Sequence, residues 1–524
     1  MLKYLCNIGV TFALLGCAPE QKPVGALTFL RGGVLAPAGT EGGRAVADGR
    51  VFVARPWSPG EAVSLGGLEA VAPRLAECEP LFHTTLGDVS RLIAMGGESP
   101  DTSLAWSPDG ALLAVGAYTG ELVVVDGWTG QELARRTLAE TMVKMLAWSE
   151  DSATLYAGEQ SPDAYLYALD GRTLGERWRV RLADEVQSSA PPAGQDLYGV
   201  YSLPAAYGIH VLPGGDLLVA AAHGWNLPDG TRRNQSRLLR LSAAGERVAA
   251  WPDEVADATI FDPRVDPSRT LAIAPVNRSA TGPAPAGLPI GGAAVIRLDD
   301  MSLVTGVTPE PLAPWYKTAF LWEALDVDPV SATALLGLGD GRVLLYGLDG
   351  ALKRTLEPGT PVMVGEVPIS ASVGFGALVD DSVVFITSNT NIPYGAAMPD
   401  LRPPSAHPGE NTLWVYGLDG ALRWTWRGEQ RLNGLHIGPD GHTLVVGAGP
   451  RIADVRRDLY GALIFDLGGE ARSGDERLSA LCATASPIFF RQALSADGRL
   501  AVTEVPSRGP DGAVLGDYRV TVFR

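Results

Sequence analysis

The stretch that most constrains the fold of this chain covers residues 104–138, where short apolar segments alternate with tight turns. The turns combine Pro, which presets φ, Asp, which bonds its own backbone, and Gly, which accepts positive φ. We expect strands over 104–106, 111–116, 121–126 and 132–138. A four-stranded meander of this size cannot bury both faces alone, so it needs neighbours of its own kind.

Similar meanders recur to the end of the chain, with first turns near residues 109, 151, 215, 267, 330, 381, 440 and 497. Repeats at intervals of about 40 to 65 residues are typical of a β-propeller. We therefore predict an all-β propeller of four-stranded blades, eight in number, with seven as the alternative. The last unit shows only three strands, so a strand from residues 26–72 should complete it and close the ring.

Composition agrees with this fold class and excludes one class of partner. Gly (63) and Pro (39) are abundant and only 19% of the 524 residues are charged, which favours short strands and turns over helices. The formal net charge of −17 argues against nucleic-acid binding, which needs a basic surface.

The N-terminal residues predict export. Lys3 precedes an apolar stretch too short to span a bilayer, and the stretch ends Leu14-Leu15-Gly16-Cys17. This end resembles the lipobox of bacterial lipoproteins, which implies lipidation at Cys17 and a location in the bacterial cell envelope, at the outer membrane. An ordinary secretory signal with a chance cysteine is the alternative. The expected organisation is a signal peptide over 1–16, a tether over 17–43 and a single propeller domain over 44–524.

Two cysteines remain once Cys6 leaves with the signal and Cys17 serves as the anchor. Cys78 precedes the first unit and Cys482 precedes the last, and these units are neighbours in a closed ring. In an oxidising compartment we expect a Cys78–Cys482 disulfide that staples the closure, with two separate buried thiols as the alternative.

The repeats themselves resemble known propeller repeats. Ser107-Pro108-Asp109-Gly110 and Gly438-Pro439-Asp440-Gly441 are similar to WD40 and YVTN repeats. Residues 166–173 with Trp178, and 415–420 with Trp424, resemble the PQQ-type repeat of quinoproteins and of BamB-like lipoproteins. The resemblance implies propeller architecture and leaves activity open, because one fold hosts many functions.

No pattern in the sequence predicts a catalytic residue, a metal site or a cofactor. A quinoprotein would need adjacent cysteines, and the six His show neither HxH nor HExxH spacing. His436 and His442 flank a turn, which favours solvated turn residues. The Asp residues of the repeated Asp-Gly pairs are expected to cap turns, and Trp106 and Trp148 to pack between sheets.

Long loops are the better candidates for recognition, because long loops on a rigid frame are uncommon unless they have a function. Three are expected, over residues 183–207, 277–292 and 388–411, with passive disorder as the alternative interpretation. The candidate binding residues in them are Tyr198, Tyr201, Tyr207, Asn391, Tyr394, Arg402 and His407.

The functional prediction combines these features. We expect a monomeric, exported propeller that the lipid anchor at Cys17 holds at a membrane, with its loops presented to an envelope protein or glycan as a non-enzymatic scaffold. The alternatives are a propeller enzyme (a quinoprotein-like dehydrogenase, a lyase or a hydrolase) and a small-molecule sensor with its ligand in the central channel.

Overall fold

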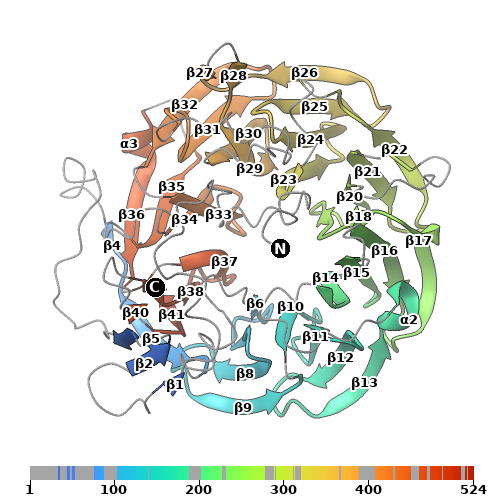
Figure 1. Cartoon of the computed structure of the whole chain (residues 1–524), viewed down its shortest axis with the longest axis vertical. Helices are drawn as coiled ribbons and strands as arrows, with labels where there is room; N and C mark the ends of the chain where they lie inside the picture. The colour runs from blue at the N-terminus through green and yellow to red at the C-terminus, as the bar shows by residue number, and fades with distance from the viewer. Residues whose placement is uncertain are drawn as a thin grey trace.

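The computed structural model describes residues 34–35, 44–47, 50–53, 76–87, 103–139, 141–187, 202–226, 232–277, 288–289, 291–310, 312, 320–364, 367–388, 407–428, 431–449, 460–468, 473–484, 486, 488–508, 514–515 and 517–524. Their strands form antiparallel meanders arranged as a ring (Figure 1). Each meander runs outward from the axis, so its first strand is innermost and its fourth is outermost.

The strands are grouped here by their order within each sheet, from the ring axis outward. The inner strands are β6 (Ser103–Trp106), β10 (Met142–Trp148), β14 (Ala205–Val211), β18 (Thr259–Ile260) with β19 (Arg264–Val265), β23 (Phe320–Asp328), β29 (Ser372–Val379), β33 (Arg431–Ile437) and β37 (Ile488–Leu494). The second strands are β7 (Leu112–Gly116), β11 (Thr154–Gln160), β15 (Leu217–Asn226), β20 (Leu271–Asn277), β24 (Thr333–Leu338), β30 (Ser382–Ser388), β34 (Thr443–Gly449) and β38 (Leu500–Glu504). The third strands are β8 (Glu121–Asp126), β12 (Tyr165–Asp170), β16 (Arg232–Leu241), β21 (Gly292–Arg297), β25 (Val343–Gly347), β31 (Thr412–Gly417), β35 (Gly461–Asp466) and β41 (Arg519–Phe523). The outer strands are β9 (Glu132–Thr137), β13 (Glu176–Arg181), β17 (Arg247–Ala256), β22 (Leu303–Val307), β26 (Leu352–Leu356), β32 (Leu422–Arg427), β36 (Leu478–Ala483) and β5 (Pro80–Thr85).

Several smaller described elements are not among the four main strands of any sheet. They are β1 (Val34–Leu35), β2 (Arg44–Ala47), β3 (Arg50–Val53), β4 (Ala76–Glu77), β27 (Val362–Val364), β28 (Val367–Ile369), β39 (Ser507–Arg508), β40 (Val514–Leu515), and the short helices α2 (Ala183–Val186) and α3 (Gly474–Arg477). No helix among the described residues is long and apolar enough to cross a membrane.

The predicted fold class is confirmed: the chain is an all-β propeller of four-stranded antiparallel meanders closed by an N-terminal strand. In the stretch 104–138, the four strands begin and end within one residue of the prediction. The blade number of eight, with seven as the alternative, stays a prediction, because β10–β17 pair as one continuous sheet and the links between several units lie outside the described ranges.

The closing strand was predicted in the wrong place. Strand β5 completes the last sheet by pairing antiparallel with β41, whereas the prediction placed the closing strand within residues 26–72. The described strands in that earlier stretch, β1, β2 and β3, pair with one another instead. The segment of β5, Pro80–Thr85, carries only two large apolar residues, so its strand character is weak in the sequence.

The core lies between neighbouring sheets. Most second and third strands of the meanders are buried on both faces, as in β7, whose five residues are all buried, and β24. The outer strands alternate exposed and partly buried residues, as in β9. This gradient follows from the ring, because sheets packed face to face leave only their outer edges to solvent.

The predicted role of the Asp residues is confirmed. Asp126 Oδ1 accepts hydrogen bonds from the backbone of Trp128 at 3.0 Å and of Thr129 at 2.9 Å. Asp170 binds the equivalent turn in the next sheet, and these hydrogen bonds, led by those from Thr173, lower the pKa of Asp170 to about 2.

The predicted packing role of the two tryptophans is also confirmed. Trp148 Nε1 donates to the Ala105 carbonyl oxygen at 2.9 Å, and Trp106 Nε1 donates to that of Ala493 at 3.0 Å. Each indole therefore ties its own sheet to the inner strand of the sheet before it, which fixes the spacing of neighbouring sheets around the ring.

Candidate functional site

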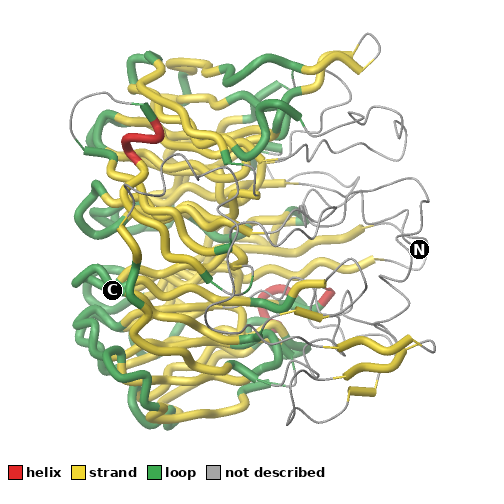
Figure 2. Tube along the Cα trace, turned by 90° about the vertical axis from the view of Figure 1, so that its left-hand side faces the viewer, coloured by secondary structure: helices red, strands yellow, loops and turns green. Residues whose placement is uncertain are grey.

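The two faces of the ring differ in the length of their connections. The turns between the first and second strands, and those between the third and fourth strands where the chain connects them directly, lie on one face, which we call the turn face; in the last sheet no turn joins β41 to β5. The loops in green gather at this face in Figure 2. The other connections begin and end on the opposite face, which we call the insertion face. The strand ends that flank the three predicted long loops lie there, at α2 and β14, β20 and β21, and β30 and β31.

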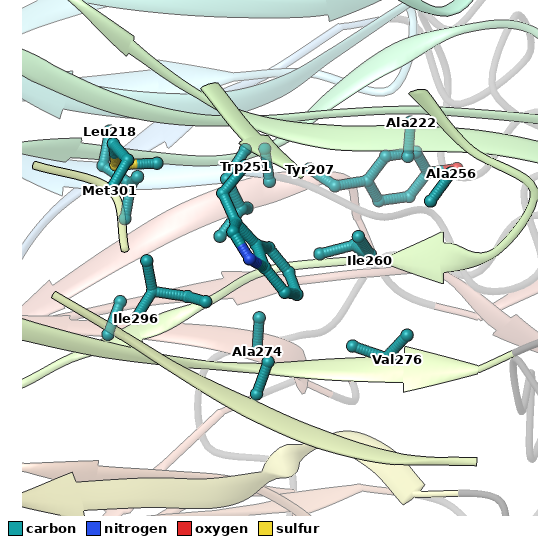
Figure 3. Packing of buried hydrophobic residues seen from close by; sticks show 14 of the residues in the cluster. Tyr207, Leu218, Ala222, Trp251, Ala256, Ile260, Ala274, Val276, Ile296 and Met301 are labelled. Carbon is teal, nitrogen blue, oxygen red and sulfur yellow. The ribbon is translucent and has the colours of Figure 1, made fainter. Parts of the chain in front are cut away.

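The candidate Tyr207 lies in a strand and not in a loop. It is 7% exposed in β14, and its ring stacks on Phe261 with centroids 4.3 Å apart. Figure 3 shows the ring among the buried side chains of Ala222, Ala256 and Ile260. Lys144 Nζ lies 5.1 Å from the centroid of the same ring. Tyr207 therefore packs between sheets, and the predicted loop over 183–207 is shortened at both ends by α2 and β14.

The candidate His407 is also buried, at 2% exposure, just before β31. Its Nδ1 accepts a hydrogen bond from Gly409 N at 2.9 Å, which leaves Nε2 to donate to the Ile369 carbonyl oxygen, also at 2.9 Å. Burial lowers the pKa of His407. His407 therefore anchors the end of the third long loop to β28 and does not present its ring to a partner.

The other loop candidates, Tyr198, Tyr201, Asn391, Tyr394 and Arg402, lie outside the described residues, as does the lipidation candidate Cys17. Cys78 and Cys482, the pair predicted to form a disulfide, are bonded in the structure, with Cα atoms 4.8 Å apart. The bond joins β36 to the segment between β4 and β5. It therefore lies between the last two sheets, and not between the first and last as the prediction assumed.

A group of titratable residues near the ring axis was missed in the sequence. In every sheet, one residue of the inner strand has the same register relative to the first turn. This residue pairs with the corresponding residue of the second strand, as Ala105 pairs with Ala114 and Arg264 pairs with Ile273. We call this position the axial layer. It comprises Ala105, Ala147, His210, Arg264, Asp326, Ala377, His436 and Ala493.

Arg264 is the electrostatic centre of the axial layer. After burial, which is the larger cause, its positive charge further lowers the pKa values of His210 and His436 and partly offsets the raised pKa of Asp326; these three residues belong to three other sheets. Its Nε is buried without a hydrogen-bond partner, and no described residue forms an ion pair or hydrogen bond with the guanidinium group. A partly buried guanidinium with unused donors is costly unless something binds it.

The two histidines of the layer are neutral bases. Burial is the main cause of the lowered pKa of His436, about 4, with Arg264 as the second cause. Burial also lowers the pKa of His210, whose ring makes a hydrogen bond to the backbone of Pro263 while Nε2 is buried without a partner. The expectation that His436 is a solvated turn residue is therefore wrong, since His436 lies within β33.

Asp326 has a structural partner on each oxygen. Its carboxylate accepts hydrogen bonds from Leu378 N at 2.7 Å and from Val327 N at 2.9 Å, so it ties β23 to β29. Burial raises the pKa of Asp326 to about 6 despite these bonds and Arg264. Sequence alignment of the units on their first turns would have placed Asp326, Arg264 and the histidines in one layer, but irregular spacing concealed it.

No group of three or more His, Cys, Asp or Glu side chains in the described part of the chain could hold a metal ion. The titratable members of the axial layer are one arginine, two histidines and one aspartate.

Comparison with known proteins agrees with the fold. A family model described as the anaphase-promoting complex subunit 4 WD40 domain matches residues 92–151, which include the first described meander. The chain is a β-propeller, and its similarity to a WD40 model covers this first meander. No curated protein sequence matches it.

Three solved structures are similar at low sequence identity. The C-terminal WD40 domain of Sif2 has 12% identity and a TM-score of 0.48, over 86% of this chain and 99% of that one. The computationally designed Ika8 protein has 14% identity and a TM-score of 0.47, over 85% and 99%. BamB from Moraxella catarrhalis has 11% identity and a TM-score of 0.40, over 79% and 93%.

Proposed function

We propose that this chain is an exported, membrane-anchored propeller that binds a protein or glycan partner of the cell envelope through the insertion face. The observation that carries the proposal is the segregation of connections. The strand ends that flank the long insertions lie on one face, and the opposite face has tight turns held by Asp, as at Asp126 and Asp170. A rigid ring with insertions on one face is a typical arrangement for recognition.

The Cys78–Cys482 disulfide supports export. Disulfides persist in oxidising compartments and are rare in the cytosol. Together with the lipobox-like end at Cys17, it favours an envelope location. A Cys17→Ser variant, compared with the unchanged chain by membrane fractionation, should move from the membrane to the soluble fraction. Retention of this variant on the membrane would argue against the anchor.

The partner is tested by crosslinking in intact cells that produce the chain, followed by capture and identification of the crosslinked species. A variant with Tyr198, Tyr201, Tyr394 and Arg402 all changed to alanine should lose the species that the unchanged chain captures. The matched control is Val330→Ser on the turn face, where Val330 is 95% exposed, and it should retain capture. Equal capture by all three chains, or loss in the control alone, would contradict the proposal.

A further inference from the structure

At the insertion face, His223 connects the end of one meander to the beginning of the next. It lies in β15 and is buried, at 3% exposure. Its Nδ1 is 3.0 Å from the carbonyl oxygen of Val186, the last residue of α2. Its Nε2 is 3.1 Å from the carbonyl oxygen of Ser202, just before β14. One imidazole ring therefore bonds both segments.

Both partners of the ring are acceptors, so both ring nitrogens have to donate. A neutral imidazole carries one N–H and one lone pair, and a lone pair that faces a carbonyl oxygen is repelled by it. Only the imidazolium form donates from both nitrogens. The indole of Trp225 stacks on the ring, with centroids 4.4 Å apart, and an aromatic face stabilises a cation. These contacts favour the charged ring, whereas its burial opposes the charge.

We propose that His223 is a pH-sensitive clamp between α2 and the segment that enters β14. In acid, the imidazolium donates to Val186 and Ser202 together. As the pH rises, the ring loses one proton, keeps a single donor and gives up one of the two carbonyl groups. The clamp acts whether or not a partner binds the insertion face, so it is a property of the propeller itself.

His223 is the group around this clamp whose charge changes near neutral pH. The charged side chains described on α2 and on the adjoining part of β16 form ion pairs, which join Asp184 to Arg181, Glu185 to Arg237 and Arg247, and Arg233 to Asp257. Carboxylates and guanidinium groups keep their charges around neutral pH. The second histidine nearby, His210 of β14, pairs with Leu218, five residues along β15 from His223, and burial lowers the pKa of His210.

The test is amide hydrogen exchange of the full chain at pH 5.5 and pH 8.5, expressed as protection relative to the intrinsic exchange rate at each pH. In the unchanged chain, we expect protection over residues 183–186 and 202–206 to be about tenfold greater at pH 5.5, as expected for one hydrogen bond from a charged donor. Protection in β24 and β25, across the ring, should be the same at both values of pH.

Two variants and a control assign this effect to the ring. His223→Gln cannot become charged, so protection of the two segments should be low at both values of pH. His442→Gln makes the same change at an exposed residue of a turn and should retain the pH dependence of the unchanged chain. Trp225→Leu removes the aromatic face that supports the cation, so the loss of protection should begin at lower pH.

A second measurement needs only the unchanged chain, which covers the case that His223→Gln folds poorly. Nitrogen-15 NMR of the histidine rings should show both nitrogens of His223 protonated at pH 5.5 and only one at pH 8.5. A ring in the same protonation state at both values of pH would overturn the proposal. So would an equal pH dependence of protection in His223→Gln and the unchanged chain, or its loss in His442→Gln.

Discussion

At the residue scale, the glycine of some Asp-Gly pairs is required by the tryptophan of its own sheet. An added Cβ at Gly171 would lie 2.5 Å from Cζ3 of Trp148, and one at Gly127 would lie 2.8 Å from Cζ3 of Trp106. The same indoles donate hydrogen bonds to the preceding sheet, so they cannot move away without losing that link. The Asp holds the turn, and the Gly makes room for the tryptophan.

This contact predicts that Gly171→Ala lowers the free energy of unfolding by about 1–3 kcal/mol, the usual cost of overpacking. Denaturant unfolding measures the change. Gly175→Ala in the same turn is the matched control, because its added Cβ would meet its nearest atom at 3.4 Å and should have little effect. Combining Gly171→Ala with Trp148→Leu should recover part of the loss, and simple additivity of the two changes would contradict the steric explanation.

The aspartates in the turns make the free energy of unfolding depend on pH in the acidic range. Asp170 has a folded pKa of about 2 against an ordinary value of 3.8, because Thr173, Arg172 and Arg177 bond its charged form. A lowered pKa contributes stability above about pH 4, and this contribution is lost as the pH falls toward 2. Asp126 and Asp440 have pKa values lowered for the same reason. Their exposure to solvent keeps each contribution small.

We therefore expect the thermal midpoint of the unchanged chain to fall between pH 4 and pH 2, and Asp170→Asn to make that fall shallower. Midpoints measured across this range by circular dichroism check the prediction. Asp253→Asn is the control, because its exposed carboxylate caps no described turn and its replacement should leave the slope as it is. A slope that Asp170→Asn leaves unchanged would show that other groups govern acid stability.

At the element scale, the repeating strands could be predicted from the sequence and the closing strand could not. Residues 104–138 combine apolar runs with Pro, Asp and Gly turns, so local chemistry alone specifies four strands there. Strand β5 has no such turns around it, and its partner β41 lies more than 400 residues away in the chain. Its strand conformation comes from pairing at the edge of the last sheet, a tertiary effect that single-sequence patterns do not carry.

The candidate sites show the same difference between what local sequence patterns predict and what only tertiary structure determines. Residue type within expected loops predicts Tyr207 and His407 as binding residues. The structure buries both, because β14 and the segment before β31 extend further than the turn signals indicate. The axial layer was missed because its members are single residues, 50 to 110 positions apart at irregular spacing, that only the register of closed sheets brings together.

The Cys78–Cys482 disulfide holds the segment that leads into the closing strand β5. Cys482 is 1% exposed in β36, and β36 pairs in parallel with β4, so the bond holds the N-terminal segment where it crosses to β5. Replacing both cysteines by serine should cost about 2–5 kcal/mol of unfolding free energy, since the bond closes a long loop in the unfolded chain. Reductant should lower the thermal midpoint of the unchanged chain and not that of the double variant. Peptide mapping that finds both thiols free in the native chain would contradict this expectation.

At the scale of the whole molecule, the ring must also close between the last sheet and the first. Arg499, in the first turn of the last sheet, lies with its guanidinium carbon 4.7 Å from the ring centroid of Trp106 and 3.8 Å from that of Trp128. Its Nη2 donates to the Gly110 carbonyl oxygen at 2.7 Å, and its Nη1 donates to that of Gly127. One side chain from the last sheet is thus bound between two turns of the first, on the turn face.

This arrangement predicts local opening of the ring when Arg499 is lost. Arg499→Ala should destabilise the chain by about 2–4 kcal/mol, through loss of charged hydrogen bonds and of the contacts with the two indole rings. Amide hydrogen exchange should rise most in β6, β7, β37 and β38, and least in β24 and β25 across the ring. Arg499→Lys keeps the charge but cannot reach both carbonyl groups as a fork, so it should restore only part of the protection. A uniform rise in exchange around the ring would show that Arg499 supports global stability and not this particular junction.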